Sequence, residues 1–292
     1  MASLPPKAAF AARIVLCGLV YAAASSLSGA LVSALGLKMI ELPAGASAQA
    51  VALASLLAAP LLPLALAPLA ARLPGARMAR AAWLALFTYV AFGLNTMIEA
   101  RIFSTMVVPG AFAGMALFYA LPSFALALAT AAAFPARDAR PLPLPRRAPA
   151  AWAARFALAW LAFPAVYLLF GTLISPLVIA DYQRGLGGLA LPPLGVVVLT
   201  QLGRSLLYLV SVLPLVLFWS GGWRPLAVRL GWAWWVLVGL YGLITAFWMP
   251  AHLRLIHSLE IGADSFAYAF VLAWALRAPS RRSAAAAAQP TA

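Results

Sequence analysis

The sequence predicts an all-α integral membrane protein whose eight transmembrane helices form two parallel four-helix repeats. Three observations lead to this prediction: an apolar composition, long apolar runs, and basic residues gathered in alternate connections. Of the 292 residues, 65% are hydrophobic and only 9% are charged, whereas a soluble globular domain carries about 25% charged residues. The mean hydropathy of +0.99 also excludes an ordinary soluble protein.

Eight apolar runs are long enough to cross the hydrocarbon core as helices. A helix needs about 20 residues to cross ~30 Å of hydrocarbon. The predicted spans are residues 12–36, 47–71, 80–102, 109–134, 152–180, 194–219, 228–249 and 254–277. Because their number is even, both ends of the chain are expected on one side of the membrane.

The basic residues predict the orientation of these spans, since cytoplasmic connections are enriched in Lys and Arg. One side collects Lys7, Arg13, Arg72, Arg77, Arg80, Arg137, Arg140, Arg146, Arg147, Arg155, Arg224, Arg229, Arg277, Arg281 and Arg282. The other side has Lys38, Arg101, Arg184 and Arg254. We therefore expect both termini in the cytoplasm and the protein in the cell (inner) membrane.

Five tryptophans lie close together in the sequence near one cytoplasmic edge. They are Trp219, Trp223, Trp232, Trp234 and Trp235. Tryptophan is enriched where membrane helices meet water, so this cluster predicts an aromatic belt at the membrane surface.

The two halves of the chain resemble each other. The segment FAARIVL at 10–16 is similar to WAARFAL at 152–158, and the same offset matches Gly29 with Gly171 and Ser33 with Ser175. A second constant offset matches Pro43, Arg80, Trp83, Gly93, Thr96 and Tyr119 with Pro192, Arg229, Trp232, Gly242, Thr245 and Tyr268. Each half has an even number of spans, so a duplication predicts repeats that run parallel.

This organisation divides the chain into four parts. Residues 1–134 form the first four-helix repeat and 151–278 the second. Between them, residues 135–150 are rich in Pro and Arg, which predicts an extended cytoplasmic linker. Residues 279–292 are rich in Ala and are expected to be a disordered cytoplasmic tail.

Polar residues on three spans are predicted to lie at a similar height in the membrane. Counting 1.5 Å per residue from the cytoplasmic end of each span places Asp264, Arg204 and Asn95 at about 20 Å. The same count places Glu260 at about 25 Å, with Glu99 and His257 near the outer surface. A charged side chain in hydrocarbon costs several kcal/mol, roughly 3 on insertion scales, so such groups should turn inward and find partners.

The last span carries its polar groups on one helical face. His257, Glu260, Asp264 and Tyr268 are three or four residues apart, which aligns them along the helix. Arg204 is the one basic residue placed well inside a span, and a guanidinium binds a carboxylate through paired hydrogen bonds. We therefore expect Arg204 to meet Glu260 and Asp264 across the bundle.

Two readings of this charged layer remain open. The ions could form a ligand or ion site that opens outward, or a structural pair that fixes how the helices fit together. The second offset places Ser55 opposite Arg204 and Met115 opposite Asp264, so only one half carries the charges. A site here would be single, and a central pore lined by equivalent residues is disfavoured.

The sequence offers no established catalytic or cofactor motif. A phosphate-binding loop, a dinucleotide fingerprint, a zinc-protease helix and a nucleophile elbow are all missing, so we expect no cofactor, no metal and no catalytic residues. The net charge of +14 comes from basic residues between apolar runs, which argues against a nucleic-acid partner. The expected partner is the lipid bilayer; protein partners cannot be inferred.

The function expected from these features is a permease-like carrier of a small polar or anionic solute, or of protons. Arg204 would contact an anion or act as counter-ion, and Glu260 and Asp264 would gate or titrate. Asn95, Glu99 and His257 would line the outer entrance, with Tyr268 on the same helical stripe. The alternatives are a non-catalytic membrane subunit held by a structural ion pair, and an intramembrane enzyme acting on a lipid-linked substrate.

Overall fold

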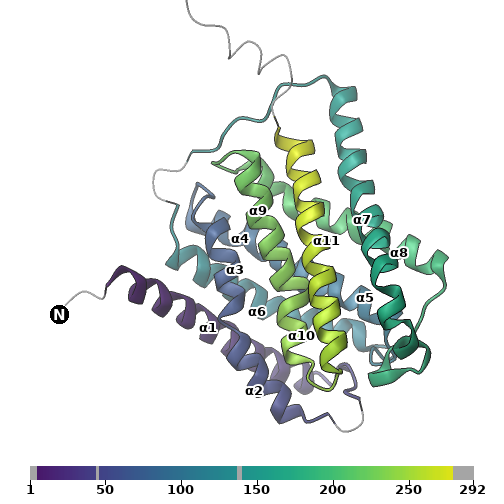
Figure 1. Ribbon diagram of the computed structural model, residues 1–292. Coiled ribbons are helices and arrows are strands. Elements are labelled where there is room, and N and C mark those ends of the chain that lie inside the picture. Colours follow the sequence, from purple (N-terminus) through teal and green to yellow (C-terminus); the bar gives the residue numbers. More distant parts are fainter. Residues whose placement is uncertain (1–4, 44–45, 137–139, 279–292) are drawn as a thin grey trace, which may run out of the picture.

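The computed structural model describes residues 5–43, 46–136 and 140–278 (Figure 1). Within these ranges eight helical segments are long and apolar enough to cross a membrane. They are Pro6–Ala34, Ala48–Ala70, Arg77–Phe103, Ala111–Ala133, Pro149–Gln183, Leu194–Leu217, Trp223–Thr245 and Ala251–Arg277. The predictions of an all-α fold and of eight such segments are confirmed, which supports a multi-pass membrane protein. The predicted tail, 279–292, lies outside the described residues.

Five spans are single helices and three are interrupted. The single helices are α1 (Pro6–Ala34), α6 (Ala111–Ala133), α7 (Pro149–Gln183), α8 (Leu194–Leu217) and α11 (Ala251–Arg277). The second span consists of α2 (Ala48–Ala58) and α3 (Leu61–Ala70). Pro60 lies between α2 and α3, and because proline has no N–H to donate, it interrupts the regular hydrogen bonding of the helix.

The third and seventh spans each contain a π-helical segment. In the third span, η1 (Tyr89–Leu94) joins α4 (Arg77–Thr88) to α5 (Asn95–Phe103). In the seventh, η3 (Trp235–Leu240) joins α9 (Trp223–Trp234) to α10 (Tyr241–Thr245). A π segment has a wider turn than an α-helix, so the side chains that follow it face a different direction from those of an uninterrupted α-helix.

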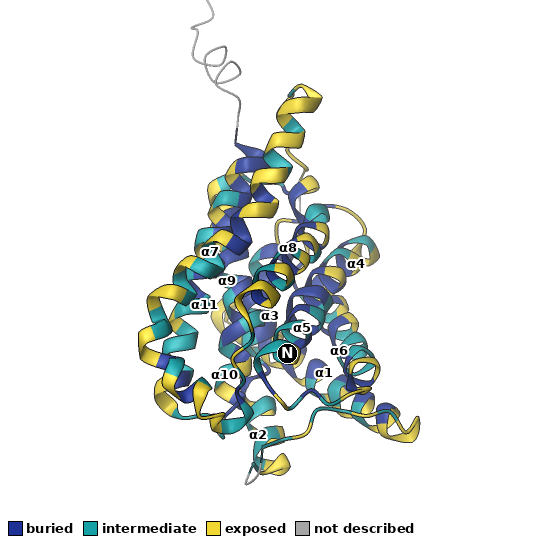
Figure 2. Ribbon diagram, turned by 90° about the vertical axis from the view of Figure 1, so that its right-hand side faces the viewer, coloured by how far each residue is buried: buried dark blue, intermediate teal, exposed yellow. Residues whose placement is uncertain are grey.

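The helices of each half pack in the same order. The fourth span of each half contacts the first and the third: α6 packs against α1 and α4, and α11 against α7 and α9. The halves meet through α3 with α9 and α4 with α8. Figure 2 shows buried residues where helices face one another and exposed residues along the outer turns of α7. Those outer turns carry leucines such as Leu169, Leu173 and Leu177, which suits contact with lipid.

Connections on the side opposite the arginines are joined by backbone hydrogen bonds. We call this the outer-loop side; it holds the connections 35–47, 104–110, 184–193 and 246–250. The bonds run from Glu41 N to Met106 O (3.0 Å), Thr105 N to Gly188 O (2.9 Å) and Ala190 N to Phe103 O (2.8 Å). The ends of several spans are thereby held in one layer.

On the arginine-rich side, arginines bond to the free carbonyls at helix ends. Arg13 Nη1 donates to Ala133 O at 3.3 Å, and Arg155 Nη1 donates to Ala275 O at 2.8 Å. Arg80 is buried and donates to two carbonyls at the end of α6. The last carbonyls of a helix have no partner within the helix and carry partial negative charge. These arginines therefore stabilise helix ends in addition to marking one side of the membrane.

The linker lies against the second half. Arg147 donates to Leu276 O at 3.1 Å and also to Ala278 O, while Arg277 donates to Leu142 O at 3.0 Å. Burial, and secondarily the charge of Arg155, lowers the pKa of the Arg147 guanidinium. The described part of the linker is therefore attached to the protein through these hydrogen bonds, while most of its residues remain exposed.

The predicted tryptophan belt is only partly correct. Trp219 and Trp234 are buried inside the bundle. The Trp219 indole N–H donates to Gly222 O at 3.1 Å, and the Trp234 ring packs 5.0 Å from the ring of Tyr268. Composition marked these rings as interfacial, but α9 turns Trp234 towards α8 and α11, where aromatic side chains fill the core.

Candidate functional site

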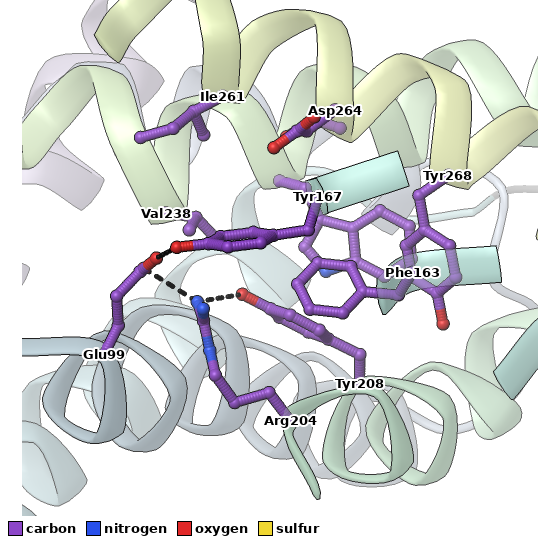
Figure 3. Close-up of a pocket in the computed structure, with 11 residues that line it drawn as sticks. Glu99, Phe163, Tyr167, Arg204, Tyr208, Val238, Ile261, Asp264 and Tyr268 are labelled. Carbon is purple, nitrogen blue, oxygen red and sulfur yellow. Dashed lines mark hydrogen bonds and ion pairs between the residues drawn. The ribbon is translucent and has the colours of Figure 1, made fainter. Parts of the chain in front are cut away.

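Arg204, on α8, is the charged centre of the site. Its side chain is 1% exposed, and its guanidinium donates to Glu99 Oε2 and to Gln201 Oε1, each at 2.8 Å. A third, longer bond of 3.5 Å reaches the hydroxyl of Tyr208 (Figure 3). Charge-assisted hydrogen bonds of this kind are about twice as strong as neutral ones, so Arg204 is held firmly in the bundle.

The ion-pair partner of Arg204 differs from the prediction. The sequence favoured Glu260 and Asp264 on α11, but the structure pairs Arg204 with Glu99 on α5. The height of Glu99 was counted from Arg80 along a continuous α-helix. Arg80 is in fact buried, and η1 interrupts the α-helix between the two residues. Counting also gave no information on direction, and α5 packs against α8.

Glu99 is held from two sides. Its Oε1 accepts a hydrogen bond from the Tyr167 hydroxyl at 3.1 Å, while Oε2 accepts from Arg204. The Glu99 side chain keeps 26% exposure and lines both cavities described below. It therefore connects the buried guanidinium to a space that a ligand can enter.

Asp264, on α11, is a buried carboxyl group without a protein partner for one of its oxygens. The residue is 7% exposed, and Oδ1 makes no hydrogen bond within the described part of the chain. In Figure 3 the ring of Tyr167 lies between Asp264 and the Arg204–Glu99 pair. An isolated ionised carboxylate is costly to bury, so such a group takes up a proton, a cation or a water molecule.

A small cavity joins these groups. It has a volume of about 30 Å³ and is lined by Glu99, Arg204 and Asp264 together with aromatic residues. A water molecule needs roughly 10–15 Å³ of such volume and several polar partners. A water molecule therefore fits in this cavity.

A larger cavity of about 440 Å³ adjoins the small one, between α5, α7 and α11. Asp264 and Glu99 line both. Its lining continues to Leu189, Leu191 and Met249 in the connections of the outer-loop side. The larger cavity therefore extends from the outer-loop side to Asp264, and ligand sites commonly have volumes of roughly 300–1,000 Å³.

His257 and Glu260 form a second polar pair in the wall of the larger cavity. His257 Nδ1 donates to Glu260 Oε2 at 2.7 Å, and the Tyr182 hydroxyl lies 3.1 Å from Nε2. With Nδ1 donating, a neutral imidazole accepts at Nε2, so the tyrosine hydroxyl is its donor. Three predicted residues of the α11 stripe, His257, Glu260 and Asp264, thus line one cavity.

Aromatic side chains close the site towards the arginine-rich side. Phe163, Tyr208, Trp234 and Tyr268, the aromatic cluster, pack with ring centroids 4.9 to 6.4 Å apart. On α7, Phe163 lies one turn nearer the arginine-rich side than Tyr167. The same holds for Tyr208 relative to Arg204 on α8, and for Tyr268 relative to Asp264 on α11. Predicted Tyr268 belongs to this cluster, and its buried hydroxyl has no partner among the described residues.

Asn95 does not join the site. It is fully buried, its two amide atoms have no hydrogen-bond partner in the described ranges, and it lines neither site cavity. The residue directly follows η1, which changes the face that it presents. Its expected position at the outer entrance is therefore wrong.

Sequence reasoning missed three residues that the structure places around the ion pair. Gln201 and Tyr208 lie three and four residues from Arg204, so helical spacing could have identified them. Tyr167 had no such signal, because an uncharged tyrosine in the middle of a span is common in membrane helices.

These features define a polytopic membrane protein with a charged, buried site at the inner end of a cavity. No known protein family, curated protein or solved structure matches this chain. What the site can do chemically therefore rests on its own geometry. The free carboxyl oxygen of Asp264 can bind a proton or a positively charged group, while the Arg204 guanidinium is bonded to Glu99 and Gln201 and only its buried Nε lacks a partner among the described residues.

Proposed function

We propose that the protein is a permease-like carrier of protons or of a small cationic solute, with Asp264 as the binding group. The observation that carries this proposal is the buried Asp264 carboxyl, whose Oδ1 is unpaired at the end of a cavity of about 440 Å³. Ionisable residues within membrane spans commonly mark proton or solute pathways.

The charges that line the cavities favour a cation over an anion. Glu99, Glu260 and Asp264 supply three carboxyl groups, and Arg204 supplies one guanidinium. The guanidinium is 1% exposed and already bonded to Glu99 and Gln201, so it has little capacity left for an anionic ligand. An anionic solute, which the sequence left open, is therefore the less favoured cargo.

The proposed transport direction follows from the arginines. The positive-inside rule places the arginine-rich side and both termini in the cytoplasm, and the outer-loop side outside the cell's inner membrane. The cavity then faces outward, and the aromatic cluster closes it towards the cytoplasm. Transport would require this cluster to separate while the outer-loop connections close, as in alternating access.

Contacts that recur at constant sequence offsets support the proposed parallel repeats. The same offset relates Arg13 to Arg155 and Ala133 to Ala275, and both arginine–carbonyl hydrogen bonds are present. The third spans of both halves also contain a π segment.

Close approaches between the third and fourth spans also recur. A Cβ at Gly93 would lie 2.9 Å from Tyr119, and one at Gly239 would lie 2.8 Å from Ile261. This contact places Tyr119 opposite Ile261, whereas the sequence alignment placed it opposite Tyr268. The offset that relates Gly29 to Gly171 therefore fits the fourth spans better than the offset that relates Tyr119 to Tyr268.

The decisive experiment measures proton flux into liposomes that contain the purified protein and a trapped pH-sensitive dye. A K⁺ diffusion potential set by valinomycin supplies the driving force. We expect flux with the wild type, and flux at the level of protein-free liposomes with Asp264→Asn. Asp181→Asn is the matched control: Asp181 pairs with Arg184 and His252 near the outer-loop ends of α7 and α11 and does not line either cavity.

A second measurement tests a cationic solute in place of protons. Methylammonium should raise the melting temperature of the wild type and of Asp181→Asn, but not of Asp264→Asn. If the wild type shows neither proton flux nor this stabilisation, or if Asp264→Asn retains both, the carrier proposal fails.

The Arg204–Glu99–Tyr167 network favours one second candidate, a non-catalytic membrane subunit. Every link in this network is made within the protein, as a purely structural ion pair requires. Such a subunit would show no flux, and its folded amount would fall when Glu99 or Arg204 is replaced. A partner that copurifies with the wild type at fixed stoichiometry would support this candidate.

A further inference from the structure

A cavity larger than both site cavities lies outside the charged site. It has a volume of about 1160 Å³ and lies between α1, α2, α6, η3 and α10. This exceeds the usual range of roughly 300–1,000 Å³ for small-molecule sites. It shares Thr96, Ala100 and Met106 with the 440 Å³ cavity, so the two adjoin at α5.

The mouth of this cavity faces the surroundings of the bundle. Three leucines of its lining are exposed: Leu19 on α1 is 50% exposed, and Leu53 and Leu56 on α2 are 57% and 43% exposed. These leucines are within membrane spans, so the opening between α1 and α2 meets acyl chains in a bilayer. Only Ala58 of α2 is buried, which leaves that helix loosely covered.

The wall of the cavity is mostly apolar. Among the described residues that line it there is no Asp, Glu, His, Lys or Arg. Several of its hydroxyl groups are paired with backbone carbonyls: Ser25 with Tyr21 O at 2.9 Å, Ser26 with Ala22 O at 3.2 Å, and Thr245 with Gly242 O at 3.0 Å. The buried Thr96 hydroxyl, which the 440 Å³ cavity also reaches, has no partner among the described residues. A water-filled space would leave much of this apolar surface wetted, whereas a hydrocarbon chain covers it.

One polar atom near the outer-loop end is unpaired. Trp248 lies in the connection between α10 and α11 and lines the cavity, and its buried indole N–H has no partner within the described residues. Indole is a donor only, so it requires an acceptor such as an ester carbonyl or a phosphate oxygen. Tryptophan commonly occupies this height, where chains meet headgroups.

We propose that this cavity binds a bilayer phospholipid, with one acyl chain inserted between α1 and α2 and an ester or phosphate oxygen at Trp248. The continuity of the mouth with the bilayer, the uncharged wall and the unpaired donor all favour this occupant. The bound chain would contact Thr96 and Ala100 of α5, which also line the 440 Å³ cavity.

The test uses the full-length protein in liposomes that contain phosphatidylcholine with a photoactivatable diazirine at the end of one acyl chain. After illumination, peptides that carry lipid are identified by mass spectrometry. We expect adducts on residues inside the cavity, such as Ser25, Phe118 and Tyr241. Adducts confined to outward-facing leucines of α1 and α7 would overturn the proposal.

A pair of corresponding glycines supplies matched variants. A Cβ at Gly29 would lie 3.6 Å from Phe118 in this cavity, and a Cβ at Gly171 would lie 3.6 Å from Glu260 in the site cavity. Gly29→Leu should lower the interior adducts by roughly tenfold through overpacking, while Gly171→Leu should leave them unchanged. Equal adducts in both variants would contradict the proposed site.

Two further measurements keep the test decisive. Ser26→Leu narrows the same cavity from a more exposed position and should also lower the adducts if Gly29→Leu does not accumulate. Native mass spectrometry should detect one bound phospholipid on the wild type and on Asp264→Asn. Detection of a second protein chain or of a smaller molecule in its place would identify another occupant and reject the phospholipid.

Discussion

The two large cavities occupy comparable places in the two halves but differ in chemistry. Gly29 faces Phe118 in the first, and Gly171 faces Glu260 in the second, at the same distance of 3.6 Å from a Cβ. Thr245 and Glu99 lie the same number of residues after the starts of η3 and η1, so they occupy corresponding positions in the seventh and third spans. The offset that relates the glycines also relates Met115 to His257 and Pro122 to Asp264. The cavity along α1 and α6, completed by η3 and α10 of the second half, thus lacks charges where the cavity along α7 and α11 carries them.

This difference indicates that the charges are not required by the scaffold. Buried ion pairs often contribute little to stability compared with apolar groups of similar size, because desolvation offsets their attraction. The uncharged cavity, with Met115, Phe118 and Thr245 in its lining, shows which apolar or neutral side chains can occupy such positions. This comparison supports the binding role proposed for the carboxyl groups of the 440 Å³ cavity.

The largest effect is expected when the ion pair is broken from one side. Arg204→Met leaves Glu99 largely buried without its cation and should lower the free energy of unfolding by about 3 kcal/mol. Denaturant unfolding in detergent micelles measures this loss. Arg184→Met, which removes an arginine whose side chain is 70% exposed, is the control and should change stability by under about 1 kcal/mol.

Replacing both partners should restore most of that loss. Arg204→Met combined with Glu99→Thr, which introduces the residue type of Thr245 at the corresponding place in the seventh span, should unfold within about 1 kcal/mol of the wild type. The same unfolding measurement applies. If the double variant is as unstable as Arg204→Met, the charges are structural. The inference that the scaffold does not require them is then wrong.

A change of opposite sign is expected at Asp264. Because its Oδ1 has no protein partner, Asp264→Leu removes a buried polar group and should raise the free energy of unfolding by about 1 kcal/mol. Differential scanning fluorimetry should show a higher melting temperature for this variant. A fall of similar size would mean that the ionised carboxylate is stabilised by contacts inside the bundle.

The smallest effect is expected at the rim of the site. Exchanging the His257–Glu260 pair for the first-half residues, as His257→Met with Glu260→Phe, should alter stability by about 1 kcal/mol, because the net contribution of a hydrogen bond is of this size. Proton flux would show whether the His257–Glu260 pair takes part in transport. Unchanged flux would restrict the proposed pathway to Asp264 and Glu99, whereas reduced flux would extend it to the rim.

The fold was largely predictable because its determinants are local. Runs such as 194–219 and 254–277 contain nearly all the information that a membrane-crossing helix needs, and their ends differ from α8 and α11 by only a few residues. The interruptions were harder to predict. Pro60 has a local signature, but η1 and η3 depend on packing against neighbouring helices, which hydropathy does not describe.

The site was only partly predictable for the same reason. Helical spacing placed His257, Glu260 and Asp264 on one face, and that face lines one cavity. The partner of Arg204 depended on which face α5 presents after η1, and this cannot be counted along a single helix. Asn95 was misplaced by the same assumption of a continuous helix.

The attachment of the linker has a consequence for how the chain can be divided. Leu142 N bonds to Trp219 O, and Arg147 and Arg277 tie the segment 140–148 to the carbonyl ends of the second half. If the chain were cut within 135–139, the segment 140–148 would therefore stay bound to the downstream fragment alone. Two separately synthesised pieces, 1–134 and 140–292, should reassemble through α3 with α9 and α4 with α8, so the covalent tether is dispensable for docking.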